Sequence, residues 1–253
     1  MSEENKESIT IKKETLWKYS TFILAALLII GAFMVFNNGS PTGSVITGQT
    51  VAPGTVAVPS GPVKITIDSD DPILGNADAK VTVIKFSDFS CPFCAAASGD
   101  NEEMVSYMKQ RNPSWEPIVT NFIKDYVDTG KARFVMKYAM GHSGGRSAQL
   151  VAWCLNDQKL YWKFHAKAFA NIDDVEDLDK MKNLAKEVGA DLTKLQSCLD
   201  SKKYDSKFNK HEQQGSAAGV EGTPAFFVNG KILSGAQPYS TFKQAVEAEL
   251  AVA

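Results

Sequence analysis

The stretch SDFSCPFC, residues 87–94, constrains the fold of this chain more than any other. It follows an apolar run with strand character at residues 81–86, and it precedes a segment, residues 95–109, that has almost no β-branched residues. This pattern predicts a strand, a turn and a helix in that order. Cys91 is then expected at the start of the helix. Pro92 takes the first interior position, where a missing N–H costs nothing because that donor would be unpaired anyway.

The spacing of Cys91 and Cys94 points to a redox-active pair. A helix N-terminus presents free N–H groups and about half a positive charge, which lowers a cysteine pKa from about 8.5 to as low as about 3.5. We expect Cys91 to be the exposed sulfur. Cys94, one helical turn inward, is expected close enough to attack a mixed disulfide formed at Cys91. The pair is predicted to cycle between dithiol and disulfide.

Two other uses of a Cys-x-x-Cys pair fit the sequence less well. A zinc site needs a second pair of ligands, and the chain has no second Cys-x-x-Cys and no His-x-His. A purely structural disulfide at this spacing closes too small a loop to stabilise the fold much. The sequence therefore predicts neither a bound metal nor a cofactor.

The composition suits one soluble domain with an N-terminal extension. The 253 residues carry a net charge of −2 and are 44% hydrophobic, which allows a domain of up to about 200 residues and gives no sign of nucleic-acid binding. Residues 1–18 are polar with mixed charge, whereas residues 19–36 are uncharged and long enough to cross about 30 Å of hydrocarbon as a helix. A cleaved signal peptide is the competing interpretation. The run is longer than an ordinary signal core and no small-x-small site follows Phe36, which favours an uncleaved anchor.

The lysines set the expected orientation of this anchor. Four of them precede residue 19, and the next basic residue after the apolar run is Lys64. This bias predicts a cytoplasmic N-terminus and a single-pass protein of the cell membrane, with the catalytic domain on the extracytoplasmic side, where disulfides persist. Residues 37–62 are uncharged and rich in Gly, Ser, Thr and Pro, so they are predicted to form a flexible linker.

A folded α/β domain is expected from residue 63 to residue 253. Residues 63–67 alternate like an edge strand, and the acidic residues 68–72 predict a solvated turn, since they lack the glycine and the distal glutamate of a calcium loop. The remaining pattern predicts a helix at 116–129, a strand at 131–140, a helical insertion at about 143–216, a hairpin with an Asn-Gly turn at 225–234 and a last helix at about 239–250.

Four segments of this domain resemble the DsbA-like branch of the thioredoxin superfamily. They are DPILGNADAKV at 71–81, CPFC at 91–94, GVEGTPAFFVNG at 219–230 and GAQPY at 235–239, and the resemblance covers about residues 63–250. It implies a thioredoxin fold with an inserted all-helical subdomain. It also implies that Pro224 forms a cis peptide bond with Thr223 and packs against the redox pair. Both residues would then hold the substrate chain by backbone hydrogen bonds beside Cys91.

The resemblance also implies an activity and partners. DsbA-like proteins act as thiol oxidases, which implies exported proteins with free thiols as substrates and a membrane-embedded oxidase, DsbB-like or VKOR-like, that restores the disulfide. A stabilised Cys91 thiolate favours the reduced enzyme, so the oxidised enzyme gives its disulfide away readily. The alternatives are a reductase or isomerase that uses the same pair, and a redox-inert peptide-binding domain.

The two residues between the cysteines help to set this redox balance and are also expected to contact the substrate. They are Pro92 and Phe93 here, whereas the best-known members of the branch have Pro-His. Phe93 can neither donate a side-chain hydrogen bond to the thiolate nor carry a charge beside it. The sequence therefore predicts the redox pair but not its reduction potential.

Cys154 and Cys198 form a second pair of cysteines, each in a predicted amphipathic helix of the insertion. Some relatives in the DsbA-like branch carry a second pair in this insertion, so the resemblance implies a structural disulfide. Two buried free thiols are the alternative, since unpaired cysteine is among the most buried residue types.

Lys85 departs from the pattern of the thioredoxin superfamily. Thioredoxin-like proteins commonly place a buried acid six residues before the first cysteine, and this chain has lysine there. The alternation along the strand does not settle whether Lys85 points outward, with an apolar stem and an exposed charge, or lies beneath Cys91 and Cys94. In the second arrangement the ammonium stabilises thiolate and lowers the cysteine pKa, and Asp88 is the nearest candidate in sequence to balance the charge.

Overall fold

The structure, a computed structural model, describes residues 61–141 and 144–252, which lie in the second of the two units of the chain, residues 55–253. Within these residues, one sheet has the strand order β1-β3-β2-β4-β5. Its centre is β2 (Val81–Ser87), which pairs in parallel with β3 (Ala132–Tyr138) and antiparallel with β4 (Ala225–Val228). The antiparallel edge strands are β1 (Ile73–Leu74) and β5 (Lys231–Ser234).

Most of the helices lie between β3 and β4, in the place of the predicted helical insertion. The helices of the described residues are α2 (Pro92–Ser98), α3 (Glu102–Arg111), α4 (Ile118–Phe122) with its π-helical continuation η1 (Ile123–Val127), α5 (Arg146–Asn156), α6 (Tyr161–Ala170), the 3₁₀ turn η2 (Ile172–Asp174), α7 (Leu178–Glu187), α8 (Leu192–Asp200), α9 (Asp205–Ala217) and α10 (Tyr239–Val252). The order of strands and helices is that of the α/β fold expected from the sequence.

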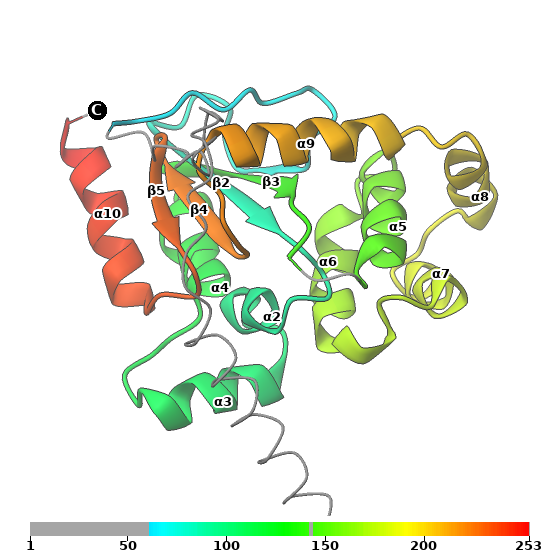
Figure 1. The fold of residues 1–253 in the computed structure, drawn as a ribbon, viewed down its shortest axis with the longest axis horizontal. Helices are drawn as coiled ribbons and strands as arrows, with labels where there is room; N and C mark the ends of the chain where they lie inside the picture. The colour runs from blue at the N-terminus through cyan, green and yellow to red at the C-terminus, as the bar shows by residue number, and fades with distance from the viewer. Residues whose placement is uncertain (1–60, 142–143, 253) are drawn as a thin grey trace, which may run out of the picture. The chain divides into compact units, whose positions relative to one another are not determined.

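Successive residues of β2 point to opposite faces of the sheet, and each face has its own apolar cluster. Val81 and Val83 pack with residues of α2, α4, α6 and α10. Ile84 and Phe86 belong to the second cluster, on which α9 packs. Figure 1 shows α9 on one side of the sheet and α2 and α4 on the other. Lys85 therefore points to the face that α2 covers.

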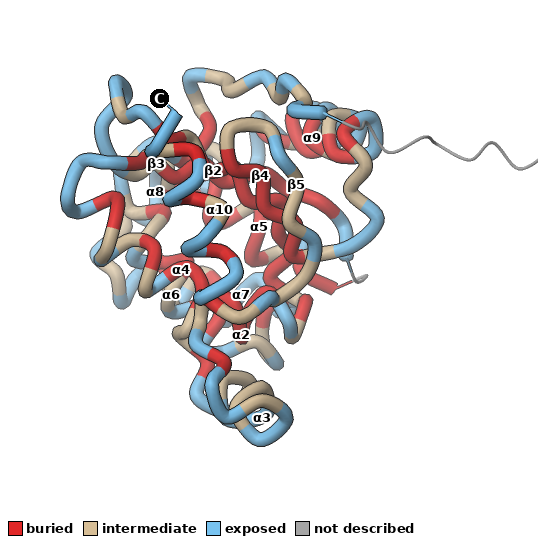
Figure 2. Tube along the Cα trace, turned by 90° about the vertical axis from the view of Figure 1, so that its left-hand side faces the viewer, coloured by how far each residue is buried: buried red, intermediate tan, exposed pale blue. Residues whose placement is uncertain are grey.

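The central strands are buried on both faces. Every residue of β4 is buried, as is every residue of β2 except Thr82, whereas α3 has no buried residue and lies at the outside of the fold (Figure 2). Helices on both faces explain why these strands read as nearly continuous apolar runs rather than as a strict alternation. The redox stretch thus follows directly after a strand that is buried except at Thr82.

The single helix predicted after Cys91 is broken in two. α2 ends at Gly99, which has a φ of 85°, and α3 begins after Asn101, whose side-chain oxygen accepts the N–H of Met104 at 2.9 Å. A Cβ at Gly99 would lie 2.6 Å from Oγ1 of Thr120 in α4, so both the turn and the close packing require glycine here.

The edge strand predicted at residues 63–67 is wrong. This segment has no strand assignment, although the N–H of Val63 donates to the carbonyl of Gly230 at 2.9 Å. Its alternating apolar residues pack against the cluster that contains Ile84 and Phe86. The alternation therefore reflects packing on the sheet rather than pairing with it.

The acidic turn at residues 68–72 is not the solvated turn that the sequence indicated. Asp71 is buried and its carboxylate contacts Nζ of Lys137 at 2.6 Å, Nζ of Lys207 at 2.9 Å and Nε2 of His211 at 3.0 Å. Asp68, Asp71 and His211 bring potential ligand atoms within 4.8 Å of one another, but the two ammonium groups already balance this charge. The cluster is an ion-pair network that ties the turn to β3 and α9.

Within the described ranges, no helix is both long and apolar enough to span a bilayer. The predicted anchor at 19–36, the N-terminal segment 1–18 and most of the predicted linker at 37–62 lie outside these ranges and stay predictions.

Candidate redox site

The turn at the end of β2 places Cys91 at the start of α2. Cys91 is the N-cap residue with extended backbone angles (φ −84°, ψ 116°), and Pro92 follows in the first turn. The Sγ of Cys91 accepts the N–H of Cys94 at 3.4 Å. This is the role that serine or aspartate oxygens play at other helix starts, and it directs free backbone donors at the sulfur.

The pKa values of the two thiols are shifted in opposite directions. The side-chain hydrogen bond from Cys94, together with the backbone N–H groups of Cys94 and Phe93, lowers the pKa of Cys91 to about 6 against the opposing effect of burial. Complete burial, and the hydrogen bond that Cys94 makes to Cys91, raise the pKa of Cys94 well above its ordinary value. At neutral pH the reduced pair therefore holds a thiolate at Cys91 and a thiol at Cys94.

Cys91 is buried, so the prediction of an exposed sulfur is wrong. When protonated, its Sγ donates to the backbone carbonyl of Thr223 at 3.2 Å, and the Thr223–Pro224 peptide bond is cis. The loop before β4 thus lies directly against the sulfur. The structure brings Cys91, Cys94, Thr223 and Pro224 together although Cys94 and Thr223 are 129 positions apart in the sequence.

Two exposed apolar side chains flank this site. Phe93 is 43% exposed between the two cysteines, and Met140 is 63% exposed after β3. Met140 and Val220 line a surface groove together with Thr223. Neither Met140 nor Val220 stood out in the sequence, because a lone apolar residue in a loop carries no pattern.

Asp88 holds the turn that carries the redox pair. Its carboxylate accepts the backbone N–H of Ser90 at 2.9 Å, the hydroxyl of Ser90 at 2.8 Å and the N–H of Gly141 at 2.9 Å. A Cβ at Gly145 would lie 2.1 Å from the Asp88 carboxylate, so glycine is needed there. Asp88 thus ties the redox turn to the loop after β3, and its action on Lys85 stays a prediction.

Lys85 does not point outward. Its side chain is fully buried, and its Nζ lies 5.1 Å from the ring centre of Phe169 and 5.9 Å from that of Phe226. Among the described residues this Nζ has no hydrogen-bond partner. Burial lowers the pKa of Lys85, while the charges that Cys94, Cys91 and Asp100 can carry raise it. Of the two arrangements left open by the sequence, the structure has the one beneath the cysteines.

Three further polar groups share this buried region, and sequence reasoning missed them. The hydroxyl of Ser87 on β2 is buried with no hydrogen-bond partner among the described residues, and it favours the thiolate of Cys94. His165 on α6 is buried, its Nδ1 lies 3.9 Å from the carboxylate of Asp100, and burial holds its pKa well below the ordinary value. Burial raises the pKa of Asp100. No motif marks these residues, since they come from three separate elements.

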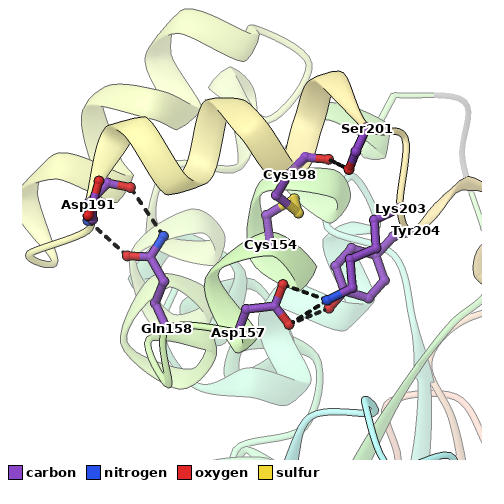
Figure 3. Close-up of a disulfide and its surroundings, with 8 residues drawn as sticks. All are labelled: Cys154, Asp157, Gln158, Asp191, Cys198, Ser201, Lys203 and Tyr204. Carbon is purple, nitrogen blue, oxygen red and sulfur yellow. Dashed lines mark hydrogen bonds and ion pairs between the residues drawn. A yellow bond between two sulfur atoms is a disulfide. The ribbon is translucent and has the colours of Figure 1, made fainter.

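A disulfide joins Cys154 on α5 to Cys198 on α8, 44 residues apart (Figure 3). Polar contacts on both sides reinforce the same junction: Asp157 contacts Nζ of Lys203 at 2.8 Å, and Gln158 accepts the N–H of Asp191 at 2.8 Å. The bridge lies on the helical layer and leaves Cys91 and Cys94 as the free thiols of the structure.

Comparison with known proteins identifies the family. A family model described as Thioredoxin matches residues 68–110 and 113–248. The chain belongs to the thioredoxin family. Disulfide bond formation protein D of Bacillus subtilis is 28% identical over 188 residues, which are 71% of this chain and 77% of that protein. The crystal structure of oxidised BdbD from Bacillus subtilis has a TM-score of 0.62 at 27% identity and covers 75% of this chain and 97% of that chain.

A third similarity is to a longer protein. The Na(+)/H(+) antiporter NhaA of Herminiimonas arsenicoxydans is 26% identical over 178 residues, which are 70% of this chain but 25% of the antiporter. The chain thus matches a quarter of that protein, and this similarity supports no ion transport here. The thioredoxin-like α/β fold and the general thiol–disulfide chemistry of the family agree with the expectations from the sequence.

Proposed function

We propose that this thiol–disulfide oxidoreductase oxidises thiols of exported proteins, with Cys91 and Cys94 as its catalytic pair. The observation that carries the proposal is the difference in acidity of the two sulfurs. The pKa of Cys91 is lowered to about 6, whereas burial raises that of Cys94 well above its ordinary value. A stabilised thiolate is a good leaving group and favours the reduced protein, so the disulfide form is the reactive oxidant.

The reaction begins with the disulfide form. A substrate thiolate attacks Sγ of Cys91, the bond to Cys94 breaks, and Cys94 leaves as a thiolate that takes up a proton. A second substrate thiolate then attacks the substrate sulfur of the mixed disulfide, which releases the Cys91 thiolate and an oxidised substrate. Attack on Cys91 is favoured over attack on Cys94 because the carbonyl of Thr223, a residue that lines the surface groove, lies 3.2 Å from Sγ of Cys91, whereas Cys94 lies one turn further along α2.

The loop before β4 would bind the substrate backbone. The carbonyl of Thr223 already contacts Cys91 at 3.2 Å, so an incoming backbone N–H would replace the thiol as its donor. Phe93 and Met140 offer exposed apolar surface on either side for residues that flank the substrate cysteine. Unfolded exported chains expose such residues, which suits a catalyst that acts before folding is complete.

The cellular setting is part of the same proposal. The apolar run at residues 19–36 would anchor the chain in the cell membrane with residues 63–253 on the extracytoplasmic side. A membrane-embedded oxidase of the DsbB or VKOR type would restore the disulfide. The disulfide between Cys154 and Cys198 suits that compartment, since such bridges persist under oxidising conditions.

A trapping experiment tests the pair and its substrates. In Cys94→Ser the thiol that could attack a mixed disulfide at Cys91 is absent. Mixed disulfides at Cys91 should therefore accumulate in cells and be identifiable by mass spectrometry. The matched control, Cys91→Ser, should trap none. The absence of exported proteins from the Cys94→Ser adducts would contradict the proposal.

The reduction potential decides the direction of the reaction. An oxidase should equilibrate with glutathione at a potential nearer to about −120 mV than to about −270 mV, which are values typical of an oxidant and of a reductant of this fold. A value at the reducing end would favour the reductase reading. No dithiol–disulfide exchange at all would favour the redox-inert peptide-binding domain.

A further inference from the structure

Lys85 is a buried lysine whose ammonium would have no hydrogen-bonded counterion. Its Nζ has no hydrogen-bond partner among the described residues, and its side chain has no exposed surface. An ammonium in such a place leaves three donors unpaired, which strongly favours the neutral amine. Phe169 and Phe226 offer the cation only their ring faces, at 5.1 Å and 5.9 Å.

The groups that face Lys85 come from four elements, and one of them changes charge with the redox state. β3 and β4 present the apolar residues Met136 and Phe226 in register with Lys85. The titratable neighbours are Cys91 and Cys94 at α2, Asp100 after α2, and His165 on α6. In the disulfide form the two sulfurs carry no charge. In the reduced form Cys91 is a thiolate, which attracts a cation at Nζ.

We propose that Lys85 takes up a proton when the Cys91–Cys94 disulfide is reduced and releases it when the disulfide forms again. This inference rests on the redox cycle proposed above. Two electrons enter the sulfur–sulfur bond, the bond breaks, Cys94 takes one proton as a thiol, Cys91 remains a thiolate, and the amine of Lys85 takes the second proton. Two substrate thiols release two protons on oxidation, so the protons balance within the complex. The new ammonium then stabilises the thiolate and makes the disulfide a stronger oxidant.

Asp100 offers a route for this proton. Its carboxylate acts on the charge of Lys85, and it lines a surface groove together with Ser90 and Pro92. Its own backbone N–H is held by the hydroxyl of Ser98 at 3.2 Å, at the end of α2. A proton can thus pass between the groove and the buried region without leaving the neighbourhood of the redox pair.

The change of the redox equilibrium constant with pH gives the number of protons taken up on reduction. Between about pH 7 and pH 8, where Cys91 is a thiolate and Cys94 a thiol, the equilibrium constant for reduction should change about 100-fold per pH unit, or about 59 mV in potential. Lys85→Met keeps the apolar stem and removes the acceptor, so about tenfold per pH unit, or about 30 mV, is expected. The control Lys163→Met, an exposed lysine on α6, should keep the 100-fold dependence.

The equilibrium would be measured against glutathione at each pH, with the pH dependence of glutathione subtracted. A tenfold dependence in the wild-type protein would overturn the inference, as would a 100-fold dependence in Lys85→Met, which would assign the proton to another group such as His165. If Lys85→Met does not fold, proton uptake by the wild-type protein on reduction is counted in weak buffer, and uptake of one proton instead of two would overturn the inference. Absence of any exchange in the wild-type protein would instead overturn the proposed function.

Discussion

The hydrogen bond from Cys94 to Cys91 can be tested with two substitutions of nearly equal size. Cys94 is the largest single cause of the low pKa of Cys91, which at about 6 lies well below the ordinary value. A lowering of one pH unit corresponds to about 1.4 kcal/mol of preferential stabilisation of the thiolate. A hydrogen bond to a charged group contributes about 1.5–3 kcal/mol, or about 1 to 2 units. Cys94→Ala should therefore raise the pKa of Cys91 to about 7 to 8.

Cys94→Ser is the matched control because its hydroxyl keeps a donor in the same place. We expect the pKa of Cys91 in this variant to stay within about half a unit of its value with cysteine. The backbone N–H groups of Phe93 and Cys94 remain in both variants, so neither should reach the ordinary value. The difference between alanine and serine then isolates the side-chain donor.

The assay is the thiolate absorbance, or the rate of alkylation, as a function of pH. Cys154 and Cys198 are bridged, so alkylation in either variant reports on Cys91 alone. At pH 7 the thiolate fraction should fall from about nine-tenths to half or less in Cys94→Ala. An unchanged pKa in Cys94→Ala would refute the reasoning, because the backbone donors alone would then account for the acidity.

Three further predictions concern stability. Asp71→Asn removes the closest carboxylate from the buried ammonium of Lys137 and leaves it only Asp68, at 4.0 Å, so it should cost about 3–5 kcal/mol in urea unfolding. Asp205→Asn at the exposed ion pair with α5 should cost less than about 1 kcal/mol, and equal losses would contradict the buried network. Burial lowers the pKa of His211, so the stability it contributes is present above about pH 6.5 and should be lost as pH falls below it. Replacing Cys154 and Cys198 by alanine opens a loop of about 45 residues and should cost about 4 kcal/mol; a loss under about 1 kcal/mol would show that helix packing alone holds α8.

The elements with strong local signals could be predicted from the sequence. The Asn229-Gly230 turn fixed the hairpin of β4 and β5, and the 3.6-residue spacing of apolar residues marked the helices from α5 to α9. The break after α2 was not predicted, although Gly99 and Asn101 are residue types that end and begin helices. The close approach of Thr120 from α4, which also requires glycine at residue 99, cannot be predicted from the local pattern.

The residues of the redox site also differ in how far the sequence predicts them. The positions of Cys91, Cys94, Thr223 and Pro224 follow from paired motifs, which carry their geometry with them. The environment of Lys85 does not, because Asp100 and the ring of Phe169 reach it from other elements. Sequence proximity suggested a neighbour three residues away as the balancing charge, whereas a buried charge depends on which side chains share a face of the sheet.

The two buried lysines of the central strands show why burial alone does not define a role. Lys137 on β3 is as fully buried as Lys85 on β2, but it lies on the opposite face, where the carboxylate of Asp71 is 2.6 Å from its Nζ. That carboxylate is held charged by several donors, so the ammonium of Lys137 has a constant partner whatever the redox state. Lys85 lacks such a partner, and the charge that it faces at Cys91 is present only in the reduced protein. Of these two lysines, only Lys85 has an environment whose charge changes with each redox cycle.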